Sequence, residues 1–110
     1  MSYQHKNLAA GRWEKLSFLE QMANIGSEVE RALNWKAKDN IIYSQQAFER
    51  ALELIDLTLD NLKFFPRLKE VARLREALVD YFSGVNQFMT EEVFWRKYFL
   101  NFTYAARRNK

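Results

Sequence analysis

The chain has 110 residues, a mass of 13.2 kDa and no cysteine, which excludes a disulfide framework and a thiolate metal site. Hydrophobic residues make up 48% and charged residues 28%, a balance typical of one globular domain. Three glycines and one proline leave few turns and argue against an all-β fold. A pI near 9.3 permits an RNA or an acidic protein as partner without requiring either.

The first part of the chain has no helical pattern and no apolar run that could serve as a signal peptide. We therefore expect an N-terminal arm over residues 1–16, followed by one helical domain over residues 17–110. Ser17 and Glu20 have the spacing of a capping box, which predicts a helix over residues 18–37. No stretch approaches the length of a membrane span, so we expect a cytoplasmic protein with no membrane partner.

Gly26 lies inside the apolar stripe of this first helix. The stripe recurs at three- and four-residue spacing and consists of Leu19, Met22, Gly26, Val29 and Leu33. Glycine costs about 1 kcal/mol relative to alanine within a helix. We interpret its presence there as a close approach of a neighbouring helix.

Three further helices follow. Asn40 is the expected N-cap of a helix over residues 41–59, and Pro66 begins a helix over residues 66–82. Acidic residues in a first turn predict the last helix, over residues 91–107. Connections of this length join antiparallel neighbours, so we predict an all-α fold, an antiparallel four-helix up-and-down bundle.

The fourth helix is unusually aromatic. At about 100° per residue, its aromatic arc is roughly 140° wide, whereas a bundle helix needs a stripe only somewhat over 100° wide. A bulky core, a buried face against a second subunit or partner, and a stacking platform for bases all fit this arc. The interface candidates are Phe94, Trp95, Tyr98, Phe99 and Phe102.

Several polar residues lie near the apolar stripes and could form a buried network or a ligand pocket: Asn24, Glu28, Arg73, Arg75, Glu76, Asp80 and Arg107. Buried charges require partners, so pairing of Glu28 or Asp80 with one of the three arginines would be sensible. Surface pairs at i,i+3 and i,i+4 along the third helix are the alternative.

The charge is uneven along the chain. Residues 1–56 hold seven Lys/Arg against eight Asp/Glu, whereas residues 57–110 hold ten against six. A basic half of this kind is compatible with phosphate contacts. The candidate residues for nucleic-acid binding are Lys63, Arg67, Lys69, Arg107 and Arg108.

Catalytic chemistry has little support. His5 is the only histidine and lies in the expected arm. The acidic row along the second helix lacks the Glu-x-x-His pairs of di-metal bundles. No phosphate-binding glycine loop, nucleophile elbow or zinc spacing is present. We therefore expect no enzyme activity, no metal and no cofactor.

The segment Tyr43-Ser-Gln-Gln-Ala-Phe-Glu-Arg-Ala-Leu52 resembles a helix of the HEPN superfamily (higher eukaryotes and prokaryotes nucleotide-binding). The resemblance implies a small, usually dimeric helical bundle that acts as a toxin ribonuclease or as the partner of a nucleotidyltransferase. Active members carry an arginine followed by a histidine near the last helices. Here Arg108-Asn109 matches only the start of that motif and no histidine follows, so the resemblance implies no ribonuclease chemistry.

Two other resemblances cover parts of the chain. Residues 48–56 are similar to the second helix of a tetratricopeptide repeat, with Ser44, Phe48 and Ala51 at its small-large-small positions. Residues 21–28, together with Arg73–Glu76 and Asp80–Phe82, resemble a family of small prokaryotic helical proteins without an assigned activity.

These observations lead to one main prediction. We expect a non-catalytic helical interaction module that forms a homodimer or binds a protein partner, in a prokaryotic nucleotidyltransferase or toxin–antitoxin-like system. The alternative is an RNA-binding accessory protein that uses the basic C-terminal half.

Overall fold

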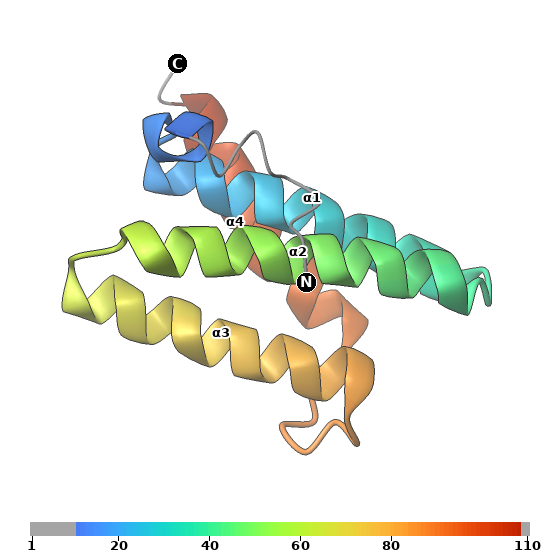
Figure 1. Ribbon diagram of the computed structural model, residues 1–110. Coiled ribbons are helices and arrows are strands. Elements are labelled where there is room, and N and C mark those ends of the chain that lie inside the picture. Colours follow the sequence, from blue (N-terminus) through green and yellow to red (C-terminus); the bar gives the residue numbers. More distant parts are fainter. Residues whose placement is uncertain (1–10, 109–110) are drawn as a thin grey trace.

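The structure is a computed structural model that describes residues 11–108 (Figure 1). Within that range every regular element is helical, so the all-α prediction is confirmed. A short 3₁₀ helix, η2 (Trp13–Lys15), precedes the four α-helices, whose bounds lie within two residues of those expected. These helices are α1 (Phe18–Ala37), α2 (Ile41–Asn61), α3 (Phe65–Ser83) and α4 (Glu92–Arg108).

Local hydrogen bonds explain where α1 and α2 begin. The Glu20 backbone N–H donates to Ser17 Oγ at 3.1 Å, and the Ser17 N–H donates to Glu20 Oε1 at 3.0 Å. This reciprocal pair is the expected capping box, and it satisfies two backbone donors that the helix leaves free. Asn40 caps α2 in the simpler way, by accepting from the Tyr43 N–H at 3.0 Å.

The first three helices lie side by side in Figure 1, and each runs opposite to the one before it. Within this row α2 packs against both α1 and α3. The fourth helix crosses behind α2 in this view and packs mainly against α1. The backbones of α3 and α4 approach each other closely at few points, and a groove lies between the two helices. Across residues 11–108 no helix is both long enough and apolar enough to cross a membrane.

Trp13 corrects the prediction of an arm over residues 1–16. Its side chain is only 1% exposed and belongs to the hydrophobic core. Its indole Nε1–H donates to Thr58 Oγ1 at 3.0 Å, and its carbonyl oxygen accepts from Gln21 Nε2 at 2.9 Å. A buried tryptophan needs an acceptor for its N–H, and Thr58 near the end of α2 supplies one. The prediction was wrong for this residue because its partner is distant in sequence.

Gly26 occupies the crossing of α1 and α4. A Cβ atom at this position would lie 2.7 Å from Phe99 Cβ and 2.9 Å from Phe99 Cγ. Both distances are shorter than a van der Waals contact between carbon atoms. The predicted close approach of a neighbouring helix is therefore confirmed, and the neighbour is α4.

Candidate functional site

Most of the aromatic arc of α4 is absorbed by the chain itself. Trp95 and Phe99 are buried in the core, so neither is accessible to a second chain. Phe102 is half-buried and packs edge-on against Phe18, with 6.2 Å between ring centroids. Phe94 is exposed and stacks on Tyr98 with 6.1 Å between ring centroids. Of the five interface candidates, Phe94 alone is exposed. Tyr98 is half-buried beside Phe94, and Phe102 is half-buried against the core.

Tyr98 joins α4 to α3. Its hydroxyl donates to Glu70 Oε2 at 3.0 Å. Burial, followed by the negative charge of Glu70, raises the pKa of Tyr98 well above its ordinary value. The phenol therefore stays protonated at neutral pH and serves as a hydrogen-bond donor rather than as a base.

A groove of about 430 Å³ separates α3 from α4 beside this bond. Leu74, Ala77, Phe94 and Tyr98 give it apolar walls. Its α3 side carries Lys69 and Arg73, and neither side chain has a hydrogen-bond or ion-pair partner within residues 11–108.

The loop between α3 and α4 is held by side chains of its own ends. The Asp80 carboxylate accepts from the backbone N–H groups of Gln87 and Phe88, at 2.8 and 3.0 Å. The Asn86 side chain donates to the Thr90 carbonyl at 2.9 Å and accepts from the Thr90 N–H at 3.1 Å. These bonds fix the path of a segment that has no regular secondary structure.

This loop and the first turns of α4 present apolar side chains to solvent. Val85, Phe88 and Met89 are 81%, 59% and 83% exposed. Val93 and Phe94 continue the series into α4 and are also exposed. We call these five residues the apolar loop surface. Exposed apolar side chains that gather in this way mark interaction sites more often than isolated ones do.

The predicted inter-helix polar network does not form. Glu28 instead accepts from Arg31 and Arg50, both at 3.1 Å. Arg75 pairs with Asp56 at 2.8 Å, and the Asp80 carboxylate accepts hydrogen bonds from two loop N–H groups. The remaining candidates do not meet one another. Asn24 donates to the Glu20 carbonyl, and Arg73 and Glu76 are exposed on α3. Arg107 lines a cavity between α1 and α4. Glu28 and Arg75 thus pair with residues on an adjacent turn or the next helix, which the linear pattern does not reveal.

The basic candidates, by contrast, are brought to one end of the molecule. The Arg67 guanidinium lies 4.5 Å from the centroid of the Phe18 ring, and Phe18 contacts Phe102, so the start of α3 adjoins the last turns of α4. Lys63 precedes α3, and Arg107 and Arg108 end α4. None of these four forms an ion pair within residues 11–108. We call Lys63, Arg67, Arg107 and Arg108 the basic end; Lys69 instead lines the α3–α4 groove.

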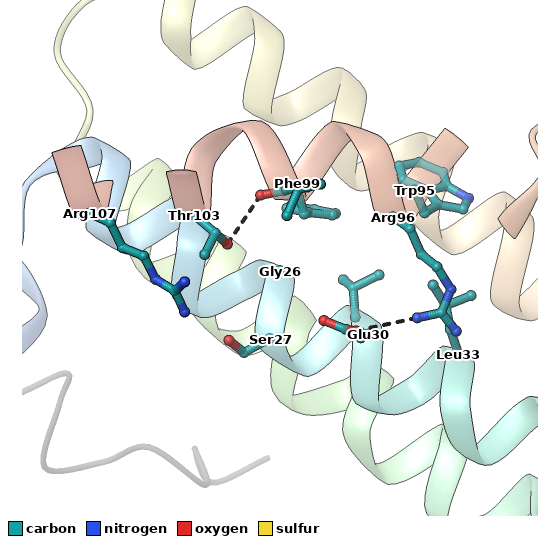
Figure 2. A pocket seen from close by; sticks show the side chains of 11 residues that line it. Gly26, Ser27, Glu30, Leu33, Trp95, Arg96, Phe99, Thr103 and Arg107 are labelled. Carbon is teal, nitrogen blue, oxygen red and sulfur yellow. Dashed lines mark hydrogen bonds and ion pairs between the residues drawn. The ribbon is translucent and has the colours of Figure 1, made fainter. Parts of the chain in front are cut away.

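A second cavity, of about 400 Å³, lies between α1 and α4 (Figure 2). We call it the α1–α4 cleft. Gly26 and Phe99 meet at its middle, and Arg107, Thr103 and Ser27 approach one another at one end. At the other end Arg96 pairs with Glu30 at 3.4 Å and with Glu92 at 2.7 Å. Gly26 and Arg107 are both candidates from the sequence, but no spacing in the sequence connects them.

Within the described part of the chain no three His, Cys, Asp or Glu side chains are placed to hold a metal ion. His5, Asn109 and Lys110 lie outside the described residues. Comparisons with protein-family models, with curated proteins and with solved structures found no match to this chain.

Proposed function

We propose that the protein is a non-catalytic helical interaction module that acts in the cytoplasm as a homodimer. The observation that carries this proposal is the apolar loop surface, which a hydrogen-bonded loop holds in the open. Apolar and aromatic side chains dominate the buried centres of protein interfaces. The alternating directions of α1, α2 and α3 support the finer proposal of an up-and-down, HEPN-like bundle, a class in which dimers and nucleotidyltransferase partners are common.

The loop conformation itself favours a binding role over simple tolerance of exposed residues. Met89 has a φ of 54° and Asn86 a φ of 55°. Asparagine tolerates this left-handed region, whereas methionine gains nothing from it. Strained residues of this kind cost about 1–3 kcal/mol and persist where the surroundings hold them. Asp80 and Asn86 supply that hold, so the loop is already ordered before a partner arrives and loses little entropy on binding.

A second copy of the chain is the partner we propose. Two copies related by a two-fold axis would place the apolar loop surface of one against that of the other, which is the commonest arrangement of homodimers. Phe94 and the α3–α4 groove beside it would extend the contact.

Sedimentation equilibrium at micromolar concentrations tests the dimer. The parent should give about twice the 13.2 kDa chain mass, and the double variant Phe88→Ser, Met89→Ser should give the single chain mass. Ile41→Ser with Ile42→Ser is the matched control, because these residues are also highly exposed but begin α2. A monomeric parent, or equal dissociation in both double variants, would contradict the proposal.

RNA binding is the second candidate function, and the basic end favours it. Arg67 lies over the ring of Phe18, and Arg108 lies 5.9 Å from the centroid of the Tyr104 ring. Unpaired cations beside exposed aromatic rings, such as Tyr104 and Phe64, are the groups that single-stranded nucleic acids contact.

A gel shift with single-stranded RNA at several salt concentrations separates the two functions. Lys63→Gln, Arg67→Gln and Arg108→Gln together should weaken binding and lower the salt slope by about 0.7 for each phosphate that is no longer neutralised. The matched triple is Lys36→Gln, Lys38→Gln and Lys97→Gln, which also removes three cations that form no ion pair within residues 11–108, two of them in cation–π contacts. Absence of any shift at low salt, or equal weakening in both triples, would reject RNA binding at the basic end.

A further inference from the structure

We propose that the α1–α4 cleft binds a small zwitterion of the amino-acid class that carries an apolar side chain. Its volume of about 400 Å³ falls in the range of roughly 300–1,000 Å³ that small-molecule sites occupy. The inference does not depend on self-association, because the apolar loop surface contributes no residue to the lining of the cleft.

Arg107 determines the anionic part of the ligand. Figure 2 shows its side chain extending from α4 across the cleft toward Ser27. It has no hydrogen bond or ion pair with any residue between 11 and 108. The other arginine of the cleft, Arg96, is already bound by Glu30, Glu92 and Asn34. A guanidinium with all its donors free matches a carboxylate through two parallel hydrogen bonds.

The hydroxyls of Ser27 and Thr103, beside Arg107, indicate which hydrogen-bonding groups the ligand carries next to its carboxylate. Ser27 Oγ donates to the Ala23 carbonyl at 3.2 Å, and Thr103 Oγ1 donates to the Phe99 carbonyl at 3.3 Å. Their protons are therefore used by the helix backbones, and their lone pairs remain as acceptors. These hydroxyls favour a ligand that brings N–H or O–H donors near its carboxylate.

Glu30 makes an ammonium the best of those donors. Its carboxylate points into the middle of the cleft in Figure 2 and accepts from Arg96 at one oxygen only. A ligand ammonium placed between Glu30 and the two hydroxyls would face only hydrogen-bond acceptors, to which its three N–H groups could donate. A carboxylate and an ammonium on the same small molecule therefore match the charges along the cleft.

The floor of the cleft is apolar. Val29 and Phe99 are buried there, and Leu100 is exposed at the rim. An aliphatic side chain would cover Leu100 and displace water from this floor, which is favourable in proportion to the apolar area covered.

Isothermal titration calorimetry of the full chain with three related probes tests the ligand class. L-Leucine carries both charges, L-leucinamide lacks the carboxylate, and 4-methylpentanoate lacks the ammonium. We expect leucine to bind, and each of the other two to bind at least about tenfold more weakly, since each lacks one charge-assisted bond. Equal binding of leucine and 4-methylpentanoate would overturn the zwitterion assignment, and no heat from leucine up to millimolar concentrations would overturn the site.

Two pairs of variants test the position. Arg107→Gln should weaken leucine binding at least about tenfold, whereas Arg108→Gln, next to it but outside the cleft, should not. Glu30→Gln should weaken leucine binding similarly. Glu92→Gln removes the other ion pair of Arg96, but Glu92 does not line the cleft, so leucine binding should not change. All four residues are exposed, so the variants should keep the parent's thermal midpoint. Equal effects within either pair would overturn the placement of the ligand.

Discussion

Replacing Gly26 should destabilise the protein even though every substitute except proline forms helices better. Alanine gains about 1 kcal/mol of helix propensity over glycine. Its Cβ, however, would lie 2.7, 2.9 and 3.0 Å from Cβ, Cγ and Cδ1 of Phe99. Rotation of the Phe99 ring cannot relieve a clash with its own Cβ, so α1 and α4 must separate. Overpacking of this kind costs about 1–3 kcal/mol, and we expect Gly26→Ala to lose up to about 2 kcal/mol net and Gly26→Leu to lose more than that.

Urea unfolding at equilibrium measures these changes. Ser27, which is exposed and adjacent, provides the control: the difference between Ser27→Gly and Ser27→Ala gives the helix-propensity increment without the clash. A Phe99→Ala background removes the clashes with Cγ and Cδ1 but keeps Cβ, so the same substitutions at Gly26 should cost less there by about 1 kcal/mol without becoming free of cost. A Gly26→Leu protein at least as stable as the parent would refute the close crossing.

Three further outcomes are expected. Trp13→Phe should lower the free energy of unfolding by about 1–2 kcal/mol more than Trp95→Phe does. Both indoles are buried, but the Trp13 Nε1–H donates to Thr58, whereas the Trp95 Nε1–H has no hydrogen-bond partner within residues 11–108. Equal destabilisation of the two variants in urea unfolding would contradict this. Since the pKa of Tyr98 is raised in the folded state, the contribution of this side chain to stability is fully present below about pH 10 and declines as the pH rises further. Tyr98→Phe should therefore show a smaller drop in urea midpoint between pH 9 and pH 11 than the parent, and an unchanged drop would reject the assignment. Structured and unstructured RNA should both stay intact with excess protein, since His5 is the only histidine; cleavage that survives His5→Ala would disprove the non-enzyme proposal.

The helices could be predicted because their determinants are local. The capping box of Ser17 and Glu20, the Asn40 cap and the break at Pro66 each act within one turn of the residue concerned. The requirement for Gly26 could also be inferred, since a costly residue in a buried stripe needs a reason. The sequence did not identify Phe99 as the neighbour, because that pairing joins residues of the first and last helices.

The sites were harder to predict because they depend on long-range pairing. Arg75 has no acidic residue three or four positions away along its own helix, and it bonds to Asp56 of α2. Asp80 likewise has no basic residue three or four positions away, and its carboxylate accepts from two loop N–H groups. The packing of α2 against α3 selected Asp56, and the path of the loop selected the partners of Asp80; the linear pattern shows neither.

The aromatic arc of α4 shows why a wide apolar face is ambiguous in a sequence. An arc wider than one stripe indicates an external partner only if the helix has one internal neighbour. Here α4 crosses the bundle and meets α1 through Phe99 and α3 through Tyr98, so two internal neighbours bury most of the arc. The side chains left for a partner are then mainly those of the loop before α4, which has no periodicity to analyse. We therefore place the proposed interface at Val85, Phe88 and Met89 rather than on the helix, in a loop that the side chains of Asp80 and Asn86 hold in position.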